Sequence, residues 1–357
     1  MSGTAECPVC DLVHLLKKRN VTAYLYSPLS FIPSRMMRGL SEAGYRPEER
    51  GMFIEVRAEE FPALIRAAGN MGGLTQMEKD AVTLCFLEEG SSFGMESLAH
   101  TKSLAQWERI LGAGDLLEVL QQGRIVTRFQ PIVDFCAKEM FACECLSRGE
   151  KSDRTLISPG ELFGSAKKAG LLFSLDKACR MSAIHTAGEL GYGGRLFINF
   201  LPTAIYNPEH CLRTTAELIA EFGMEPSRIV FEVVESEGVE DLSHLGTILD
   251  FYRSRGFLTA LDDVGSGYSS LNRLVCLRPD FVKLDMGLVR DIHRDRMKQD
   301  VFEAVQLLCR KSGITMLAEG IEQEEEAAFF HGAGVRLMQG YYFAPPSESP
   351  FSPFEEQ

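Results

Sequence analysis

Residues 257–263 read FLTALDD, an apolar run that ends in two adjacent carboxylates, Asp262 and Asp263. A buried carboxylate is costly unless it is paired or bound to a metal ion, so this run predicts a strand that leads into a functional site. The following stretch, VGSGYSS at 264–270, contains glycines that permit a sharp turn. At such a turn both aspartates can face the same side, although neighbours in a regular strand point to opposite faces.

Seven other apolar runs of similar length occur around this one, and we expect a helical stretch after each. They are IVTRFQPIV (125–133), MFACECL (140–146), RLFINF (195–200), RIVFEVV (228–234), DFVKLD (280–285), ITMLAEG (314–320) and RLMQGYYF (336–343). Eight such runs in roughly 250 residues are typical of a (β/α)₈ barrel, whose strands are covered on both faces. The sequence therefore predicts an α/β protein with a C-terminal TIM-like barrel.

Polar residues stand at or near the C-terminal end of every run, and five of the runs contribute carboxylates. In chain order these residues are Gln130, Glu144 with Arg148, Asn199, Glu232 with Glu235, Asp262 with Asp263, Lys283 with Asp285, Glu319 with Glu322, and Gln339. In such a barrel the strand ends meet at one mouth, where the active site lies. Carboxylates and an amide oxygen, without histidine, favour hard ions such as Mg²⁺ or Mn²⁺. The pattern predicts two ions about 3.5 to 4 Å apart that share a water, and hence hydrolysis of a phosphodiester.

The N-terminal part contains no motif that indicates a particular chemistry. Its apolar runs predict about three strands, and the stretches between them predict helices, the first of which would begin at a Ser34 cap. We expect a small α/β domain over 1–111, a hinge over 112–123 and the barrel over 124–357. The small domain is expected to be regulatory, with an unknown ligand or partner, or to be a scaffold or dimerisation module.

Charge and composition narrow the class of protein. The 357 residues include 37 basic and 50 acidic side chains, so the net charge is −13. This balance argues against binding to a DNA or RNA polymer, and metal ions would offset its repulsion of an anionic substrate. No stretch has the ~20 apolar residues of a membrane span, and no signal peptide pattern is present, so we expect a cytoplasmic protein. Cys7 and Cys10 form a lone Cys-x-x-Cys without a second ligand pair.

Several motifs, in the right order, resemble the EAL domain, the bacterial family of cyclic di-GMP phosphodiesterases. They are FQPIV, Glu144-Cys-Leu-Ser-Arg148, Asn199 before Pro202, Glu232-Val-Val-Glu235, LDDVGSGYSSL, FVKLD, AEGIE and QGYYFAPP. The resemblance covers about residues 113–346. It implies hydrolysis of cyclic di-GMP to linear pGpG with two Mg²⁺ or Mn²⁺ ions per site, and a homodimer formed through the barrel.

The resemblance also implies a role for each matching residue. Glu144, Asn199, Glu232 and Asp262 look like ligands of the first ion, and Asp263 like a ligand of the second. Glu319 resembles a residue with a metal-water or general-base role, and Lys283 one that orients the attacking water. Gln130, Leu146 and Arg148 resemble substrate contacts, and Gln339 and the ligands Glu144, Asn199 and Asp262 would line the same site. Glu235 resembles the anchor of the loop after the fifth strand.

Four positions depart from the family pattern: Cys145 replaces Ala, Leu201 replaces Ser or Thr, Val234 replaces Thr, and Val264 replaces Phe. None of them removes a metal ligand, and no Gly-Gly-Asp-Glu-Phe cyclase motif is present. Two other interpretations remain open. The protein could be an inactive cyclic di-GMP receptor with a regulatory binding role, or a different metal-dependent phosphodiesterase, because a barrel does not fix its substrate.

Overall fold

The computed structural model describes residues 12–71, 73–88, 91, 94, 101–205, 207–233, 242–265 and 270–354. Its contacts divide the chain into two compact units, which are Met1–Ile125 with Gly149–Leu175, and Val126–Arg148 with Asp176–Gln357. Each unit is described by itself. The domain bounds expected from the sequence stay predictions.

The first unit contains a five-stranded antiparallel sheet in the order β2-β3-β1-β4-β5. Its strands are β1 (Arg19–Tyr26), β2 (Glu48–Arg50), β3 (Phe53–Glu60), β4 (Thr83–Glu88) and β5 (Lys102–Ser103). The three long strands are the predicted ones, and the short β2 and β5 are additional. Together with helices α2 and α3 the sheet has the β-α-β-β-α-β succession of ferredoxin-like folds, so the predicted α/β domain is confirmed.

The helices of this unit, with one short strand, are α1 (Leu12–Leu15), α2 (Ile32–Glu42), α3 (Phe61–Asn70), α4 (Gln76–Ala81), α5 (Leu104–Leu111), α6 (Gly114–Gln122), β8 (Leu156–Ile157) and α7 (Pro159–Ala169). Helix α2 begins at Ile32 rather than after the predicted Ser34 cap. Pro33 occupies its first turn, where a missing N–H leaves no hydrogen bond unmade. The rings of Phe61 and Trp107 pack edge to face with centroids 5.0 Å apart. The buried indole also donates to the Leu84 carbonyl over 3.1 Å.

The second unit contains a closed barrel of eight strands, and this confirms the predicted fold class. The strands are β6 (Ile125–Asp134), β7 (Glu139–Glu150), β9 (Arg195–Phe200), β10 (Ile229–Val233), β11 (Leu258–Val264), β12 (Phe281–Leu284), β13 (Thr315–Ala318) and β14 (Leu337–Met338). Their order is β6-β14-β13-β12-β11-β10-β9-β7, and pairing of β6 with β7 closes the barrel. All eight apolar runs form these strands.

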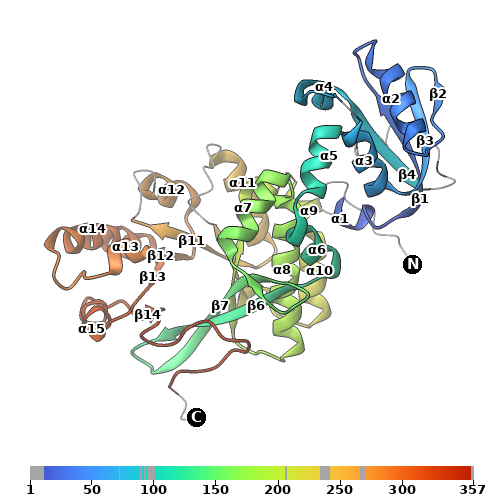
Figure 1. Cartoon of the computed structure of the whole chain (residues 1–357). Helices are drawn as coiled ribbons and strands as arrows, with labels where there is room; N and C mark the ends of the chain where they lie inside the picture. Colours follow the sequence, from blue (N-terminus) through green and yellow to red (C-terminus); the bar gives the residue numbers. More distant parts are fainter. Residues whose placement is uncertain are drawn as a thin grey trace. The chain divides into compact units, whose positions relative to one another are not determined.

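The first strand differs from the expected pattern. β6 is antiparallel to β14, whereas neighbouring strands from β7 round to β14 pair in parallel. β6 leads directly into β7 rather than into a helix, and these long strands lie side by side in Figure 1. The other helical segments are α8 (Leu172–Glu189), η2 (Pro202–Ala204), α9 (Pro208–Cys211), α10 (Arg213–Glu221), η3 (Pro226–Arg228), α11 (Leu242–Ser254), α12 (Ser270–Leu277), α13 (Met286–Val289), α14 (Arg296–Ser312) and α15 (Glu324–Gly332).

A ring of apolar side chains fills the interior of the barrel, one from each strand. These eight buried residues form one packed cluster, which we call the apolar ring: Ile132, Ala142, Phe197, Val230, Ala260, Phe281, Leu317 and Leu337. Such layers are typical of TIM barrels, whose interior is a packed core rather than a pore. The apolar ring therefore forms a floor across the barrel.

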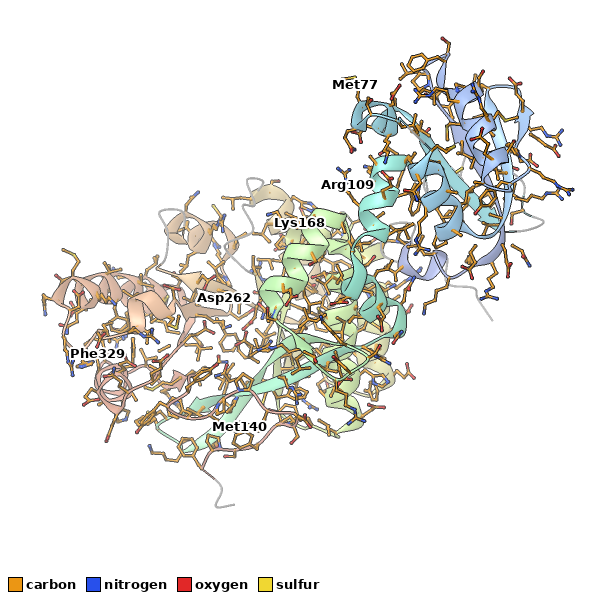
Figure 2. The ribbon with its side chains drawn as sticks, viewed as in Figure 1. Met77, Arg109, Met140, Lys168, Asp262 and Phe329 are labelled. Atoms are coloured by element: carbon orange, nitrogen blue, oxygen red, sulfur yellow. The ribbon has the colours of Figure 1, made fainter. Side chains whose placement is uncertain are left out.

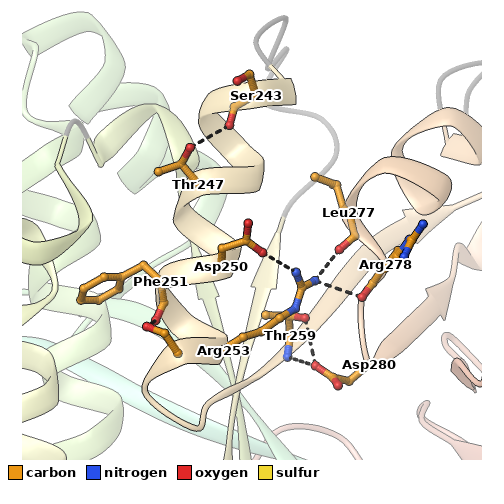
Figure 3. Close-up of polar contacts among 10 residues, drawn as sticks. Ser243, Thr247, Asp250, Phe251, Arg253, Thr259, Leu277, Arg278 and Asp280 are labelled. Atoms are coloured by element: carbon orange, nitrogen blue, oxygen red, sulfur yellow. Dashed lines mark hydrogen bonds and ion pairs between the residues drawn. The ribbon is translucent and has the colours of Figure 1, made fainter.

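Polar contacts fix the N-terminal ends of β11 and β12 (Figure 3). Asp262 lies toward the other end of β11. The Oδ2 atom of Asp280 accepts hydrogen bonds from Thr259 N at 2.8 Å and Thr259 Oγ1 at 3.0 Å. The guanidinium of Arg253 in α11 pairs with Asp250 at 3.0 Å and donates to the carbonyls of Leu277 and Arg278 at the end of α12. These bonds tie helices α11 and α12 to each other and hold the two strands in register.

Within the described part of the chain, no helix combines the length and apolar character needed to cross a membrane. The cysteines of that part are all free; Cys136 and Cys276 are exposed and the others are buried. Cys7 and Cys10 lie outside the described residues.

Candidate functional site

Every barrel strand contributes one polar residue that lies two positions from the apolar ring. Because side chains alternate along a strand, this residue faces the same interior as its apolar neighbour. We call the set the polar ring: Gln130, Glu144, Asn199, Glu232, Asp262, Lys283, Glu319 and Gln339. Asp262 is labelled in Figure 2, among the side chains of the barrel. All eight residues were predicted from the ends of the apolar runs.

Lys283 lies at the centre of the polar ring. Its Nζ atom is 2.6 Å from Glu319 Oε1, 3.0 Å from Glu232 Oε1, 3.4 Å from Glu144 Oε1 and 3.5 Å from Asp262 Oδ1. Burial would lower the pKa of Lys283, but the four carboxylates raise it well above its usual value. The ammonium is therefore charged, and the site still holds more negative than positive charge.

Glu144 is fixed by two side-chain amides as well as by Lys283. Asn199 Nδ2 donates to its Oε1 at 3.1 Å, and Gln339 Nε2 donates to its Oε2 at 2.8 Å. Burial would raise the pKa of Glu144, but Lys283 and the two amides together lower it. This carboxylate is thus kept ionised and held in one orientation.

Glu232 has a different environment, although it is only two strands away in the sheet. Its side chain is fully buried; Oε1 lies 3.0 Å from Lys283 Nζ, and Oε2 has no hydrogen-bond partner among the described residues. Burial raises its pKa well above the usual value, the Lys283 charge opposes this rise, and Glu144 and Asp262 add to it. Burial likewise raises the pKa of Glu319, against the effect of Lys283. Glu232 and Glu319 share one cation, the Lys283 ammonium, and a metal ion would supply a second positive charge.

The donor set fits a hard divalent ion. It consists of carboxylate oxygens and the Asn199 amide oxygen, which are the ligands that Mg²⁺ and Mn²⁺ prefer. The excess charge and the unpaired Oε2 of Glu232 fit an ion as well. As the described side chains stand, however, no three His, Cys, Asp or Glu residues are arranged around one ion position. The carboxylates are instead drawn toward the Lys283 ammonium.

A bulge near the end of β11 gives Asp263 a separate position. The register of β11 against β12 shifts between Leu261 and Val264, and Asp263 has the left-handed φ of 56°. Its backbone N–H donates to Asp262 Oδ1 at 2.9 Å. A bulge re-aims one side chain of a strand, and this is the physical basis for two adjacent aspartates that serve one site.

Gln130 belongs to the polar ring, but the expectation that it lies at the C-terminal end of its strand, like the other ring residues, is wrong. β6 runs against the other strands, so Gln130 lies two residues before Ile132 of the apolar ring rather than two after it. It accepts a hydrogen bond from Gln339 Nε2 at 3.2 Å and donates to the Ala344 carbonyl at 3.2 Å. These bonds connect the first strand to the last at the site.

The proposed substrate contacts Leu146 and Arg148 lie further along β7 from Glu144. They are two and four residues beyond it, so all three share one face of the strand. Both are half-buried, and Arg148 Nη1 donates to the Ser147 carbonyl at 2.9 Å. Glu235 and Val234 lie outside the described residues, as does most of the loop after Asp263.

Two acidic residues of the strand-end pattern have structural roles instead. Asp285 caps helix α13 by accepting from Gly287 N at 2.8 Å. Glu322 forms an ion pair with Arg290 at the surface. Their position near a strand end did not distinguish these two side chains from the residues of the polar ring. At the end of β13, however, the residue two positions after Leu317 of the apolar ring is Glu319, and this spacing excludes Glu322.

The sequence analysis missed a buried ion pair next to the C-terminal end of β9, formed by Asp176 and Arg180 of α8. Both side chains are only 2% exposed. The available signal was an i, i+4 pair of opposite charge within α8, but this spacing is more commonly found on helix surfaces.

Comparison with known proteins agrees with this geometry. The EAL domain family matches residues 113–346. A standalone EAL protein from Vibrio cholerae O395, solved in its c-di-GMP-bound form, is 42% identical, with a TM-score of 0.58 over 63% of this chain and 93% of that chain. The "probable cyclic di-GMP phosphodiesterase PdeG" of Escherichia coli K12 is 31% identical over 240 residues, 65% of this chain and 46% of its own length.

Likeness in fold alone extends further. BlrP1 of Klebsiella pneumoniae, solved as a manganese and cyclic di-GMP complex, is 24% identical, with a TM-score of 0.57 over 92% of this chain and 96% of that chain. This chain spans less than half the length of the curated relatives that it matches first, 36% of one and 46% of the next. Because the family match covers well over half of the sequence, the chain belongs to the EAL domain family.

Proposed function

We propose that this protein hydrolyses cyclic di-GMP to linear pGpG and that the reaction requires divalent ions, two Mg²⁺ or Mn²⁺ per site. The observation that carries the proposal is the polar ring, in which four carboxylates face one buried ammonium at the mouth of an EAL barrel. The name of PdeG and the c-di-GMP complex of the Vibrio protein support the substrate. The manganese and calcium complexes of BlrP1 support a divalent ion.

The residues that would hold the ions are those that match the ligands of the EAL family. Glu144, Asn199, Glu232 and Asp262 would hold the first ion, Asp263 the second, and Glu319 would bind directly or through water. The Asn199 amide nitrogen is engaged with Glu144, so its oxygen is left for the ion. When bound, the ions would activate a water molecule and stabilise the charge that develops on the phosphate.

The side chains of the chain itself would position the substrate and handle the proton. The Lys283 ammonium would bind a phosphate oxygen and orient the water, whose oxygen forms a bond to phosphorus while the P–O3′ bond breaks and the released O3′ takes up a proton from solvent. Glu319 would accept the proton of this water, and its raised pKa places it closer to the range of an effective general base. Gln130, Leu146, Arg148 and Gln339 would contact the dinucleotide.

The test is incubation of the full chain with cyclic di-GMP and Mg²⁺ or Mn²⁺, followed by separation of the products. We expect pGpG, and we expect none from Glu144→Ala, which removes an ion ligand. Binding of cyclic di-GMP without pGpG would contradict hydrolysis and identify a receptor. Full turnover by Glu144→Ala would show that the ligand assignment is wrong.

A receptor without turnover is the second candidate, and one observation favours it. The single Lys283 ammonium faces all four carboxylates and offsets part of their charge. If the site stays so with nucleotide bound, Lys283 would neutralise it without any ion. The affinity for cyclic di-GMP, measured in EDTA and again as Mn²⁺ is added, separates the two functions. A receptor of this kind would bind the nucleotide equally well in both conditions.

We also propose a cytoplasmic homodimer formed through the barrel, with an N-terminal domain that regulates it. Sedimentation of the full chain tests the dimer. Removal of residues 1–111 should change the hydrolysis rate more than a loss of dimerisation explains. An unchanged rate would make the N-terminal domain a scaffold.

A further inference from the structure

We propose that the buried Asp176–Arg180 pair of α8 is a positioning pair for the polar ring: it sets the point at which β9 ends, and thereby the placement of Asn199. Asp176 Oδ2 accepts from Arg180 Nε at 2.9 Å and lies 2.9 Å from Nη2. Asp176 Oδ1 accepts from the backbone N–H of Leu201 at 2.8 Å. For the role of Asn199 as an ion ligand, this inference rests on the function proposed above.

The contact lies immediately beyond the strand. β9 ends at Phe200, so the Leu201 N–H is the first amide of this segment outside the parallel ladder. A buried amide without a partner costs about 1–3 kcal/mol. The Asp176 carboxylate satisfies it and fixes the chain two residues after Asn199, just before Pro202 begins a short 3₁₀ helix. Asn199 is therefore held between the ladder on one side and this bond on the other.

Arg180 extends the same arrangement to the next helix. Its Nη1 atom donates to Thr215 Oγ1 in α10, which is itself buried. The segment from Leu201 to Thr215 is thus tied to α8 near both ends. The Asn199 carboxamide, which donates to Glu144 at 3.1 Å, depends on the path of this segment.

Stability alone does not account for two charges in this place. A buried ion pair is often replaced by apolar residues of similar volume without loss of stability, since removing the charges from water is costly. α8 already packs through Leu175, Ala183 and Ala187. A carboxylate that also accepts from the backbone next to the ring does what an apolar side chain cannot do, so we assign the pair to positioning and not to catalysis.

Two double variants test this inference. Asp176→Leu/Arg180→Met removes the charges and the acceptor for Leu201, whereas Asp176→Asn/Arg180→Met removes the charges and keeps an acceptor oxygen. We expect the Leu/Met variant to bind Mn²⁺ about 10- to 100-fold more weakly, as is usual when a residue behind a metal ligand is lost, and kcat to fall with little change in KM. The Asn/Met variant should recover most of both.

Hydrogen exchange gives a readout that needs neither metal nor activity. The Leu201 amide should exchange slowly in the wild type and in the Asn/Met variant, and markedly faster in the Leu/Met variant. The matched control is Arg213→Gln/Glu217→Gln, which removes an exposed i, i+4 pair at 3.9 Å in the neighbouring helix α10. It should leave exchange, Mn²⁺ affinity and kcat unchanged.

The inference is overturned if the Leu/Met variant binds Mn²⁺ like the wild type, or if the Asn/Met variant loses as much as the Leu/Met variant. If the Leu/Met variant does not fold, Leu201→Pro removes the same hydrogen bond from the donor side and should give the same loss. Failure of the wild type itself to bind Mn²⁺ or cleave cyclic di-GMP would contradict the proposed function instead. Exchange at Leu201 would still test the positioning pair.

Discussion

The Nζ atom of Lys283 lies 3.0 Å from Oε1 of Glu232, and this ion pair is the one polar interaction that reaches the Glu232 carboxylate within the described part of the chain. The same ammonium faces three other carboxylates. A buried cation shared in this way keeps like charges together before any metal ion arrives. The polar ring is therefore pre-assembled around Lys283, and this has measurable consequences.

Lys283→Met should destabilise the metal-free protein strongly, because it leaves four carboxylates without their buried cation. Breaking a buried ion pair on one side typically costs about 3–5 kcal/mol. Mn²⁺ should restore part of the lost Tm, since an ion bound to the native state stabilises it. Thermal unfolding in EDTA and in Mn²⁺ measures both effects. The control is Lys151→Met, which breaks a surface pair with Asp115 and should change Tm little in either buffer. Equal Tm values for the two variants would refute the central role of Lys283.

The opposite pKa shifts of Glu232 and Glu144 predict opposite pH dependences in metal-free protein. The pKa of Glu232 is raised from 4.5, so its favourable contribution is present below that value and is lost as the pH rises through the raised value. The pKa of Glu144 is lowered from 4.5, so its contribution is present above that value and is lost as the pH falls. Relative to Glu232→Gln, the wild type should lose stability as the pH rises.

Chemical unfolding in EDTA at a series of pH values checks this pair of predictions. Relative to Glu144→Gln, the wild type should gain stability as the pH rises toward 4.5, whereas the loss relative to Glu232→Gln occurs above 4.5. The two variants serve as controls for each other, because each replaces one glutamate of the ring by its neutral isostere. If the stability difference from the wild type changed with pH in the same way for both variants, the pKa values of Glu232 and Glu144 would not be shifted in opposite directions.

Much of the site could be predicted because its geometry is periodic. A strand places alternate side chains on one face, so a polar residue two positions from an inward apolar residue, as Glu144 is from Ala142, must also face inward. The direction of β6 is not encoded in this alternation, which is the same in both directions. The short connection between Asp134 and Glu139 was the available sign, since four residues cannot form a crossover helix.

Other features depend on contacts that are distant in sequence. Asp176 meets Leu201 only after α8 has packed against β9, and no local pattern specifies that meeting. The bulge at Asp263 likewise depends on how β11 pairs with β12. Asp285 looked like a ring residue because a helix cap and a strand-end ligand use the same side chain. Local sequence specified the strands, and tertiary contacts decided which acids became caps.

Asp263 combines a strained backbone with a charge, and substitutions can separate these properties. At φ 56° a β-carbon is unfavourable, but Asn and Gly tolerate the left-handed region well. Asp263→Asn should therefore fold as stably as the wild type, Asp263→Gly at least as stably, and Asp263→Ala less stably by about 1 kcal/mol. All three should lose most hydrolysis if Asp263 holds the second ion. Full activity in a stable Asp263→Asn protein would exclude that role while leaving the backbone argument intact.

At Gly340 the chain after β14 approaches the loop after β13 closely, directly beside Gln339 of the polar ring. A β-carbon there would lie 2.0 Å from the Ile321 carbonyl oxygen and 2.3 Å from its nitrogen, and φ is 156°. Both neighbours are backbone atoms held by the Ile321 N to Gln339 O and Tyr342 N to Ile321 O bonds, each 3.0 Å long, so they cannot move aside like a flexible side chain. Gly340→Ala should cost at least about 3 kcal/mol, the upper end of overpacking, and should weaken Mn²⁺ binding because Gln339 shifts with it.

Gly332→Ala is the matched control, because a β-carbon at this last residue of α15 meets nothing within 4 Å. It should leave Tm unchanged or raise it slightly, since alanine favours a helix over glycine. Urea unfolding of both variants gives the comparison. A Gly340→Ala protein as stable as Gly332→Ala would mean that the loops after β13 and β14 can separate without cost. The close approach at Gly340 would then not be what holds Gln339 against Glu144.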